Sequence, residues 1–485
     1  LLSGFVPAST FTRTLVPLIG LALTVDYALY LARRSRTGGD ARYSRRTVAL
    51  AAGVVALGFT GLAVAPTGEL RQAALAGIVT CAMAALAAIT LRPVAHASAP
   101  AVAIPAGADP RWIRWGSFVV RRPWLVLAAS AFPLALLANA ARSARLITPL
   151  DELLPAGMES ADAFRDLQRA NRAGAATILR VVVEMPEGTT VMTDAGWAAL
   201  ASTTRALRGA AGVADARSIT SIGNGDLFVA KNIFPRAVTG TFVSRDGRAA
   251  IIDVMPDLSR GAEPVLDLVR RVRAMDAAAA TGVRGAQFSV AGLPAYALDY
   301  QTAVASSLPW IVLGTSIATL VALLFAFRAP LIALKAVALN LLVAAAAIGA
   351  TVLVFQDGFG ASLMGRHALG SIFPTVPALA FGAAFGTSMD YELFLLGAVG
   401  EAKREGRDDS GAIVVGLSRT GGLITRAAAV MACLFLAFST SGLLPLAMVG
   451  FALAVAVALD ATLVRLALAP SILQIAGRWN WWPGN

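Results

Sequence analysis

Nine long apolar runs constrain the fold of this chain more than any other feature of its sequence. Each run has about the length that a helix needs to cross the hydrocarbon layer of a bilayer, roughly 30 Å thick. Inside that layer every backbone group must be hydrogen-bonded within the protein, which a helix achieves by itself. The 485 residues are 57% hydrophobic and 14% charged, so we expect a polytopic α-helical membrane protein. The runs are approximately 14–32, 48–64, 73–91, 124–141, 308–327, 336–355, 372–397, 423–439 and 446–469.

One long segment, 143–307, has the composition of a domain outside the membrane. It contains strand and helix patterns in alternation. Asp246-Gly247 is typical of a β-hairpin turn between two of the strand patterns. Two helices that cross over a small sheet indicate an α+β, ferredoxin-like unit. The expected strands are 177–184, 239–244, 248–254 and 287–291, and the expected helices are 194–207 and 265–275.

This segment divides the chain into three expected domains. Residues 1–142 form a membrane domain of four spans, which is the end of a first repeat plus the helix leading out. Residues 143–307 form the α+β domain, and residues 308–485 form a membrane domain of five spans, which belongs to a second repeat.

The distribution of basic residues predicts the orientation of the spans. The chain holds 41 Lys and Arg against 29 Asp and Glu, a net charge of +12. Basic and acidic residues balance within the 143–307 segment, so the excess lies elsewhere, largely in loops such as 33–47, which is rich in arginine. Cytoplasmic loops of membrane proteins carry such an excess. We therefore expect a multi-pass protein of the cell (cytoplasmic) membrane with 143–307 extracytoplasmic, a cytoplasmic C-terminus and no nucleic-acid partner.

The composition gives no support to a metal, cofactor or nucleotide site. Cys81 and Cys433 lie inside apolar runs, and His96 and His367 are isolated in the sequence. This distribution does not fit a disulfide framework or a metal cluster. No lysine follows a glycine in the pattern of a phosphate-binding loop. We expect neither a metal ion nor a cofactor.

A short motif occurs twice within the apolar runs. It is Asp26-Tyr27 in the first copy and Asp390-Tyr391 in the second, and each is followed by a basic loop and two further spans. Such a parallel internal repeat is typical of some secondary transporters. In the second copy three spans and the whole 143–307 segment lie between Pro123 and the span that contains Asp390, whereas only a short stretch precedes Asp26 in the first. About 240 residues are therefore expected upstream, and we interpret the chain as an N-terminally truncated fragment.

The two aspartates are candidate proton-relay residues together with their tyrosines. A carboxylate inside the membrane costs a few kcal/mol, so its presence calls for a reason. One isolated aspartate fits a structural pairing with arginine equally well, but the recurrence of Asp-Tyr favours a proton site. Small residues spaced by four before the aspartates permit close helix packing, and a two-fold-related helix pair would then bring both carboxylates together. These small residues are Ala22, Gly382 and Gly386.

Two other intramembrane carboxylates receive a structural interpretation from the sequence. Asp460 lies five residues before Arg465 and has no counterpart in the first copy, so we expect it to serve packing or orientation. Glu392 lies two residues from Asp390, which places the two side chains on different helix faces.

The sequence around both motifs resembles the MMPL (mycobacterial membrane protein large) family of the resistance-nodulation-division (RND) superfamily. The motifs that carry the resemblance include Gly386-Thr-Ser-Met-Asp390-Tyr391, Asp460-Ala-Thr-Leu-Val-Arg465 and Gly477-Arg-Trp-Asn-Trp-Trp482. The resemblance implies twelve spans, two porter-like exterior domains and proton-antiport export of lipids, drugs or other hydrophobic compounds. It assigns the relay to Asp26, Tyr27, Asp390 and Tyr391. The implied partners are a hydrophobic or lipid substrate, protons and membrane lipids, and a homo-oligomer is left open.

Two alternatives to a secondary active transporter remain at this stage. An intramembrane aspartic protease would use two aspartates to activate a water, but such enzymes have dissimilar motifs, whereas here the same motif repeats. A non-transporting or degenerate membrane scaffold is favoured by the truncation and by the 33–47 loop. This loop is short, because the interval from Asp26 to Pro93 is shorter than the equivalent interval from Asp390 to Pro470.

Overall fold

The computed structural model describes residues 10–36, 41–98, 109–149, 158–222, 227–232, 236–259 and 261–481. They form two compact units. One consists of the chain up to Leu146 and from Ala303 onward, and the other is Ile147–Thr302.

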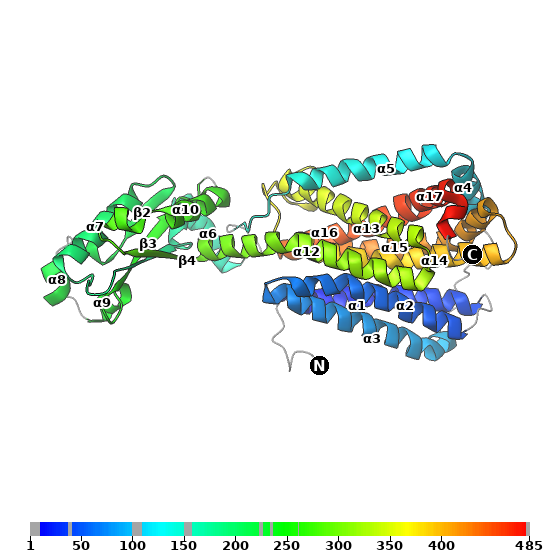
Figure 1. The fold of residues 1–485 in the computed structure, drawn as a ribbon, viewed down its shortest axis with the longest axis horizontal. Helices are drawn as coiled ribbons and strands as arrows, with labels where there is room; N and C mark the ends of the chain where they lie inside the picture. Colours follow the sequence, from blue (N-terminus) through cyan, green and yellow to red (C-terminus); the bar gives the residue numbers. More distant parts are fainter. Residues whose placement is uncertain are drawn as a thin grey trace. The chain divides into compact units, whose positions relative to one another are not determined.

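The Ile147–Thr302 unit is built on a four-stranded antiparallel sheet with the strand order β2-β3-β1-β4. Helix α7 (Asp194–Arg208) connects β1 to β2, and α10 (Ala262–Ala274) connects β3 to β4. This order and these two crossovers are those of the ferredoxin-like unit, so the predicted α+β fold is confirmed (Figure 1). The strands are β1 (Leu179–Glu184), β2 (Val213–Arg217), β3 (Ala249–Pro256) and β4 (Gln287–Gly292), and the smaller helices are α6 (Glu159–Arg169), α8 (Leu227–Asn232), α9 (Arg236–Phe242) and α11 (Ala277–Thr281).

The two central strands supply the core of this unit. Leu179, Val181 and Val183 of β1 are fully buried and alternate with more exposed residues. Ile252 and Val254 of β3 are buried on the same pattern. Since successive side chains of a strand point to opposite faces, one face of the sheet packs against helices and the other is more open.

The predicted strand 239–244 is wrong. Most of it lies in helix α9, and only Val243 pairs with the sheet, through a single bridge to Ala250. The reason lies in β3, where β1 occupies one edge over 249–254 and β2 occupies the other over 253–256. Only the start of β3 is left for a hairpin partner, so the β-branched residues before the Asp246-Gly247 turn do not form a ladder.

The other unit is a helical membrane domain, as the sequence predicts. Eight helices in the described part of the chain are long and apolar enough to cross a membrane. The remaining predicted run, 372–397, lies largely in α14, which carries acidic residues in its middle. The main helices are α1 (Thr10–Arg36), α2 (Ala41–Thr60), α3 (Gly68–Ser98), α4 (Pro110–Arg121), α5 (Pro123–Ala140), α12 (Leu293–Phe327), α13 (Pro330–Thr351), α14 (Val376–Arg404), α15 (Asp409–Ser439), α16 (Leu444–Leu459) and α17 (Ala469–Ala476).

Among the described residues of this domain, two stretches are wound as π-helix. They are Val352–Gln356, which extends α13, and Asp460–Leu468, which joins α16 to α17. A π-helix bonds residue i to residue i+5 and occurs frequently at functional sites. The second stretch is nine residues long, which makes it an unusual feature of the fold.

Helix α14 is the central packing element. It contacts α2, α13, α15 and α16, while α1, α2 and α3 pack against one another (Figure 1). Glycine allows the closest of these contacts. A Cβ placed on Gly58 of α2 would lie 2.8 Å from the backbone oxygen of Gly382 and 2.9 Å from the Cα of Gly386, both on α14. Any side chain at Gly58 would therefore push the two helices apart.

Candidate functional site

The aspartate of the first motif is bonded to the tyrosine of the second. Asp26 on α1 and Tyr391 on α14 are both buried, and the Tyr391 hydroxyl donates a hydrogen bond to Oδ2 of Asp26 over 3.0 Å. The same hydroxyl lies 3.0 Å from Sδ of Met431 on α15. The structure thus brings together residues from both copies of the repeat, at the point where three helices approach.

The second oxygen of Asp26 has a different environment. Oδ1 is buried and has no hydrogen-bond partner among the described residues. Buried polar atoms in native proteins nearly always have a partner, and an exception calls for an explanation. Oδ1 of Asp26 can therefore accept a proton without first breaking a hydrogen bond.

The other predicted relay residues are placed as follows. Tyr27 follows Asp26 on α1 and is fully buried. Asp390 immediately precedes Tyr391 in the helical backbone of α14, and its side chain lies outside the described residues. Ala22, one turn before Asp26, is buried in the packing of α1.

An aromatic pair lies one turn further along both motif helices. The rings of Tyr30 on α1 and Phe394 on α14 stack with 4.4 Å between their centroids and 7° between their planes. Each residue is the fourth after the aspartate of its own motif, so the pair joins equivalent positions of the two copies. This is the relation expected of two helices related by a two-fold axis.

Gly382 and Gly386 occupy the contact between α14 and α2. A Cβ on Gly386 would lie 2.9 Å from the backbone oxygen of Val55, and a Cβ on Gly382 would lie 3.2 Å from the side chain of Leu62. These glycines therefore fix the distance of α14 from a helix of the first repeat.

A second buried polar cluster surrounds Arg465. Its side chain has no solvent exposure, and it forms an ion pair with Glu392 at 2.7 Å and another with Asp460 at 3.0 Å. The guanidinium also donates to Asn340 Oδ1 over 3.0 Å, to the backbone oxygen of Ser388 over 2.7 Å and to the Ser388 hydroxyl over 2.8 Å. Partners from three segments of the chain thus converge on one arginine.

This cluster is what reasoning from the sequence missed. The sequence placed Asp460 in a packing role and gave Glu392 little weight, yet both carboxylates bind the same buried guanidinium. In an α-helix residues five apart do not face each other. The π-helix Asp460–Leu468 turns more slowly, which brings Arg465 beside Asp460. The five-residue spacing from Asp460 to Arg465 therefore predicts an ion pair only if a π-helix is expected there.

Two faces of α14 serve the two clusters. Ser388 and Glu392 are one turn apart and both bind Arg465, whereas Tyr391 binds Asp26. The described side chains of residues 388–392 thus connect α1 on one side with the π-helix on the other. Nearby, Lys335 of α13 is buried and donates to Oδ1 of Asn480 over 2.9 Å.

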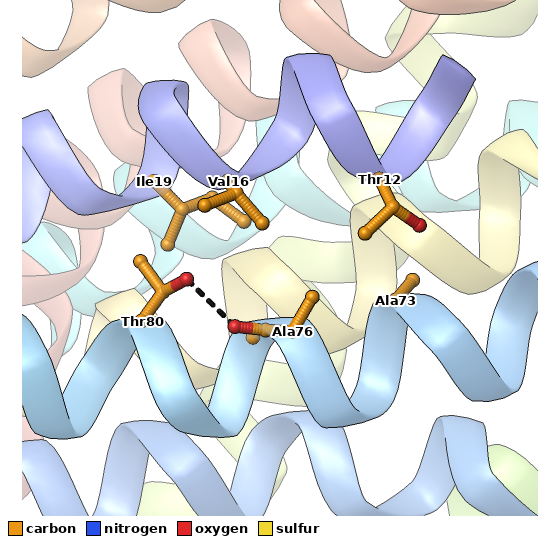
Figure 2. Close-up of a pocket in the computed structure, with 7 residues that line it drawn as sticks. Thr12, Val16, Ile19, Ala73, Ala76 and Thr80 are labelled. Carbon is orange, nitrogen blue, oxygen red and sulfur yellow. Dashed lines mark hydrogen bonds between the residues drawn. The ribbon is translucent and has the colours of Figure 1, made fainter. Parts of the chain in front are cut away.

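The groove between α1 and α3 is not part of this polar system. Figure 2 shows Thr12, Val16 and Ile19 of α1 opposite Ala73, Ala76 and Thr80 of α3. The Thr80 hydroxyl donates to the backbone oxygen of Ala76 in its own helix over 2.6 Å. The described residues that line the groove are uncharged, so what they offer is helix packing.

Residues 152–485 match the sequence profile of the MMPL family. The heme uptake protein MmpL11 of Mycobacterium tuberculosis is 31% identical over 99% of this chain and 50% of its own length. The mycolic acid-containing lipids exporter MmpL11 of Mycolicibacterium smegmatis is 30% identical over the same shares. The structure is similar to the hedgehog release protein Disp of the water bear Hypsibius dujardini, with a TM-score of 0.61, 14% identity and coverage of 96% of this chain and 64% of that one. The chain spans about half the length of the curated relatives it matches.

Proposed function

The chain belongs to the MMPL family, and on that basis we propose that the protein exports lipids or other hydrophobic compounds across the cytoplasmic membrane, driven by the proton gradient. The names of its relatives support a hydrophobic cargo, since one is a heme uptake protein and another exports lipids that contain mycolic acids. We place Ile147–Thr302 outside the cytoplasm, on the side opposite the basic loops.

The observation that carries the proposal is the hydrogen bond between Tyr391 and Asp26. It links the two copies of the repeat through a carboxylate that is buried among membrane helices. In such a place an ionisable group is by default a functional one, and chains of carboxylates serve as proton relays in pumps and transporters. Its burial excludes the role of a surface salt bridge.

Protonation of Asp26 would change how α1 packs against α14. When Asp26 is ionised, its Oδ2 accepts a hydrogen bond from the Tyr391 hydroxyl. Addition of a proton at Oδ1 removes the charge of the carboxylate and weakens this hydrogen bond. The two forms of Asp26 therefore favour different arrangements of the helices, and binding of a proton shifts the population between them. Asp390, as the repeat-related carboxylate, would take the equivalent part for the second copy.

The Arg465 cluster supports the proposed relay because it includes a charged group, Glu392, on the same helix, α14, that carries Tyr391. Arg465 faces Asp460 and Glu392 in the same buried site, and Glu392 is the residue after Tyr391 on α14. A change in the position of α14 would therefore have to keep or break the hydrogen bonds of Glu392 and Ser388 with the Arg465 guanidinium.

The test is proton-coupled export by the full-length protein in proteoliposomes. Asp26→Asn keeps the size of the side chain and a hydrogen-bond acceptor for Tyr391 but cannot exchange a proton. We expect this variant to lose proton flux and export together, whereas the exposed Asp162→Asn should retain both. Unchanged proton flux and export in Asp26→Asn would rule out the relay, and export that survives without proton flux would rule out proton coupling.

A further inference from the structure

Helix α4 has one face that is largely exposed. Its inner face carries Trp112, Gly116 and Val119, and it packs against the start of α15. A Cβ on Gly421 of α15 would lie 2.6 Å from the indole of Trp112, and one on Gly116 would lie 3.2 Å from the Cα of Val414. These close contacts fix the rotation of α4 about its own axis.

The opposite face is a stripe of arginines and aromatic rings. Its residues recur at intervals of three and four, so they lie on one side of the helix and of its C-terminal end. The order along the stripe is basic, aromatic and basic again. We define the basic-aromatic stripe as Arg111, Arg114, Trp115, Phe118, Arg121 and Arg122.

The stripe is open to its surroundings. Phe118 is 40% exposed, and Trp115 is 36% exposed although its indole N–H donates to the backbone oxygen of Leu466 over 2.7 Å. Arg111, Arg114, Trp115 and Phe118 together line a shallow hollow. In the part of the chain that the structure describes, no acidic side chain forms an ion pair with any of the four arginines. Asp109 is the acidic residue nearest in sequence, and its carboxylate caps α4 through the backbone N–H of Arg111.

The position of α4 in the chain places the stripe at a membrane surface. The next helix, α5, is a candidate span that starts at Pro123, and its first turn exposes Trp124 (68%) and Leu125 (53%). Aromatic rings at the end of a span sit at the level of lipid headgroups. A position of Trp124 at the headgroup level would put the arginines at the depth of the phosphates, with the apolar surface beside them against the acyl chains.

We propose that the basic-aromatic stripe of α4 binds the headgroup of an anionic phospholipid in the adjoining leaflet. The guanidinium fork matches a phosphate with two parallel N–H···O bonds, which an ammonium cannot do. The two arginines at each end of the stripe provide positive charge for the headgroup. The two aromatic rings between them provide an apolar contact for the first carbons of the acyl chains. This assignment is independent of the proton relay and holds whatever the protein transports.

An acidic protein partner is the other ligand that four arginines can attract. The stripe favours lipid because its charges are interleaved with exposed rings and continue directly into the exposed apolar residues of α5. A protein partner bound there would also have to displace the bilayer from Trp124 and Leu125.

The experiment measures binding of dioleoylphosphatidylglycerol and of dioleoylphosphatidylcholine to the full-length protein in detergent, by native mass spectrometry. We expect tighter binding of phosphatidylglycerol by the wild type. Arg111→Gln with Arg114→Gln should weaken it by about thirtyfold, at roughly fivefold for each basic residue near an anionic surface. Arg121→Gln with Arg122→Gln should have a similar effect. Arg111→Lys with Arg114→Lys should retain part of the affinity, because the charge remains and the fork is lost.

The matched control is Arg172→Gln with Arg205→Gln, which removes two exposed arginines from the Ile147–Thr302 unit. This pair should bind phosphatidylglycerol as the wild type does. The proposal fails if both stripe variants keep wild-type affinity, if the control pair loses as much as they do, or if affinity for phosphatidylcholine falls in parallel. Equal thermal unfolding midpoints for the wild type and every variant will establish that the arginine substitutions leave the fold intact.

Discussion

The Tyr391 hydroxyl bonds a carboxylate oxygen of Asp26 over 3.0 Å, although 365 positions separate the two residues in the chain. The bond crosses from the second copy of the repeat to the first. The aspartate of the first motif is therefore completed by a tyrosine of the second copy, and the first half of the membrane domain does not contain this arrangement by itself.

Tyr391→Phe removes this hydrogen bond and leaves the ring in place. We expect proton-coupled export by the full-length protein to fall by about a hundredfold, the lower end of what a positioned proton-transfer group contributes. Tyr296→Phe, at a 65% exposed tyrosine, should leave export unchanged. Wild-type export in Tyr391→Phe would show that Asp26 exchanges protons without this hydroxyl.

Arg465→Met leaves two buried carboxylates without their counter-ion. Removal of one partner from a buried ion pair costs about 3–5 kcal/mol, so we expect a large fall in the thermal unfolding midpoint of the purified protein. Adding Glu392→Gln and Asp460→Asn to Arg465→Met should recover much of the loss, because the uncompensated charges are then gone. A triple variant as unstable as the single one would contradict this charge argument.

Gly58→Ala tests the contact between α2 and α14. The added methyl would lie 2.8 Å from the Gly382 backbone oxygen, and forced overpacking of this kind costs about 1–3 kcal/mol. Gly53→Ala is the matched control in the same helix, since a Cβ there meets nothing within 4 Å. We expect a lower unfolding midpoint for Gly58→Ala and an equal or higher one for Gly53→Ala. Similar midpoints for the two variants would mean that the α2–α14 contact relaxes freely.

Asp215 on β2 predicts a pH dependence in the Ile147–Thr302 unit. Partial burial works to raise the pKa of Asp215, but the hydrogen bond from Arg217, the backbone N–H of Ala216 and the charges of Arg217 and Arg208 lower it below the ordinary 3.8. A carboxyl group with a lowered pKa contributes stability above its unfolded pKa and loses that contribution as the pH falls through the folded pKa. The contribution is modest, below about 1 kcal/mol, because the pairs are largely exposed.

Asp215→Asn should therefore lower the stability of this unit at pH 7 and have little effect once the pH is well below the folded pKa. Hydrogen exchange of the β2 peptide in the full-length protein measures this, with wild type and variant compared at neutral and at acidic pH. An equal effect of the substitution at both pH values would show that the charge of Asp215 does not contribute.

Much of the fold follows from local patterns. The apolar runs predict the membrane helices, and the strand patterns at 177–184, 248–254 and 287–291 predict β1, β3 and β4, because burial imposes a simple period on each element. The strand at 239–244 was predicted from the same kind of pattern and fails because the neighbours of β3, which a local pattern does not contain, already occupy its edges.

The site is predicted less completely, for a related reason. The repeat identifies Asp26 and Tyr391 as special, but the bond between them depends on how α1 approaches α14. The roles of Glu392 and Asp460 depend on a shared partner, Arg465, which becomes visible once the π-helix is known. An ion pair or hydrogen bond that depends on how three segments of the chain pack together leaves no pattern in the sequence of any single segment.

The π-helix at Asp460–Leu468 also has a consequence for chain length. A π turn accommodates one residue more than an α turn that joins the same two points. The pairing of Asp460 with Arg465 therefore depends on the number of residues between them as well as on their identity. Insertion of a single alanine between them would rotate Arg465 out of its site while every side chain of the cluster is retained, so this stretch is intolerant of changes in length that substitutions alone would not reveal.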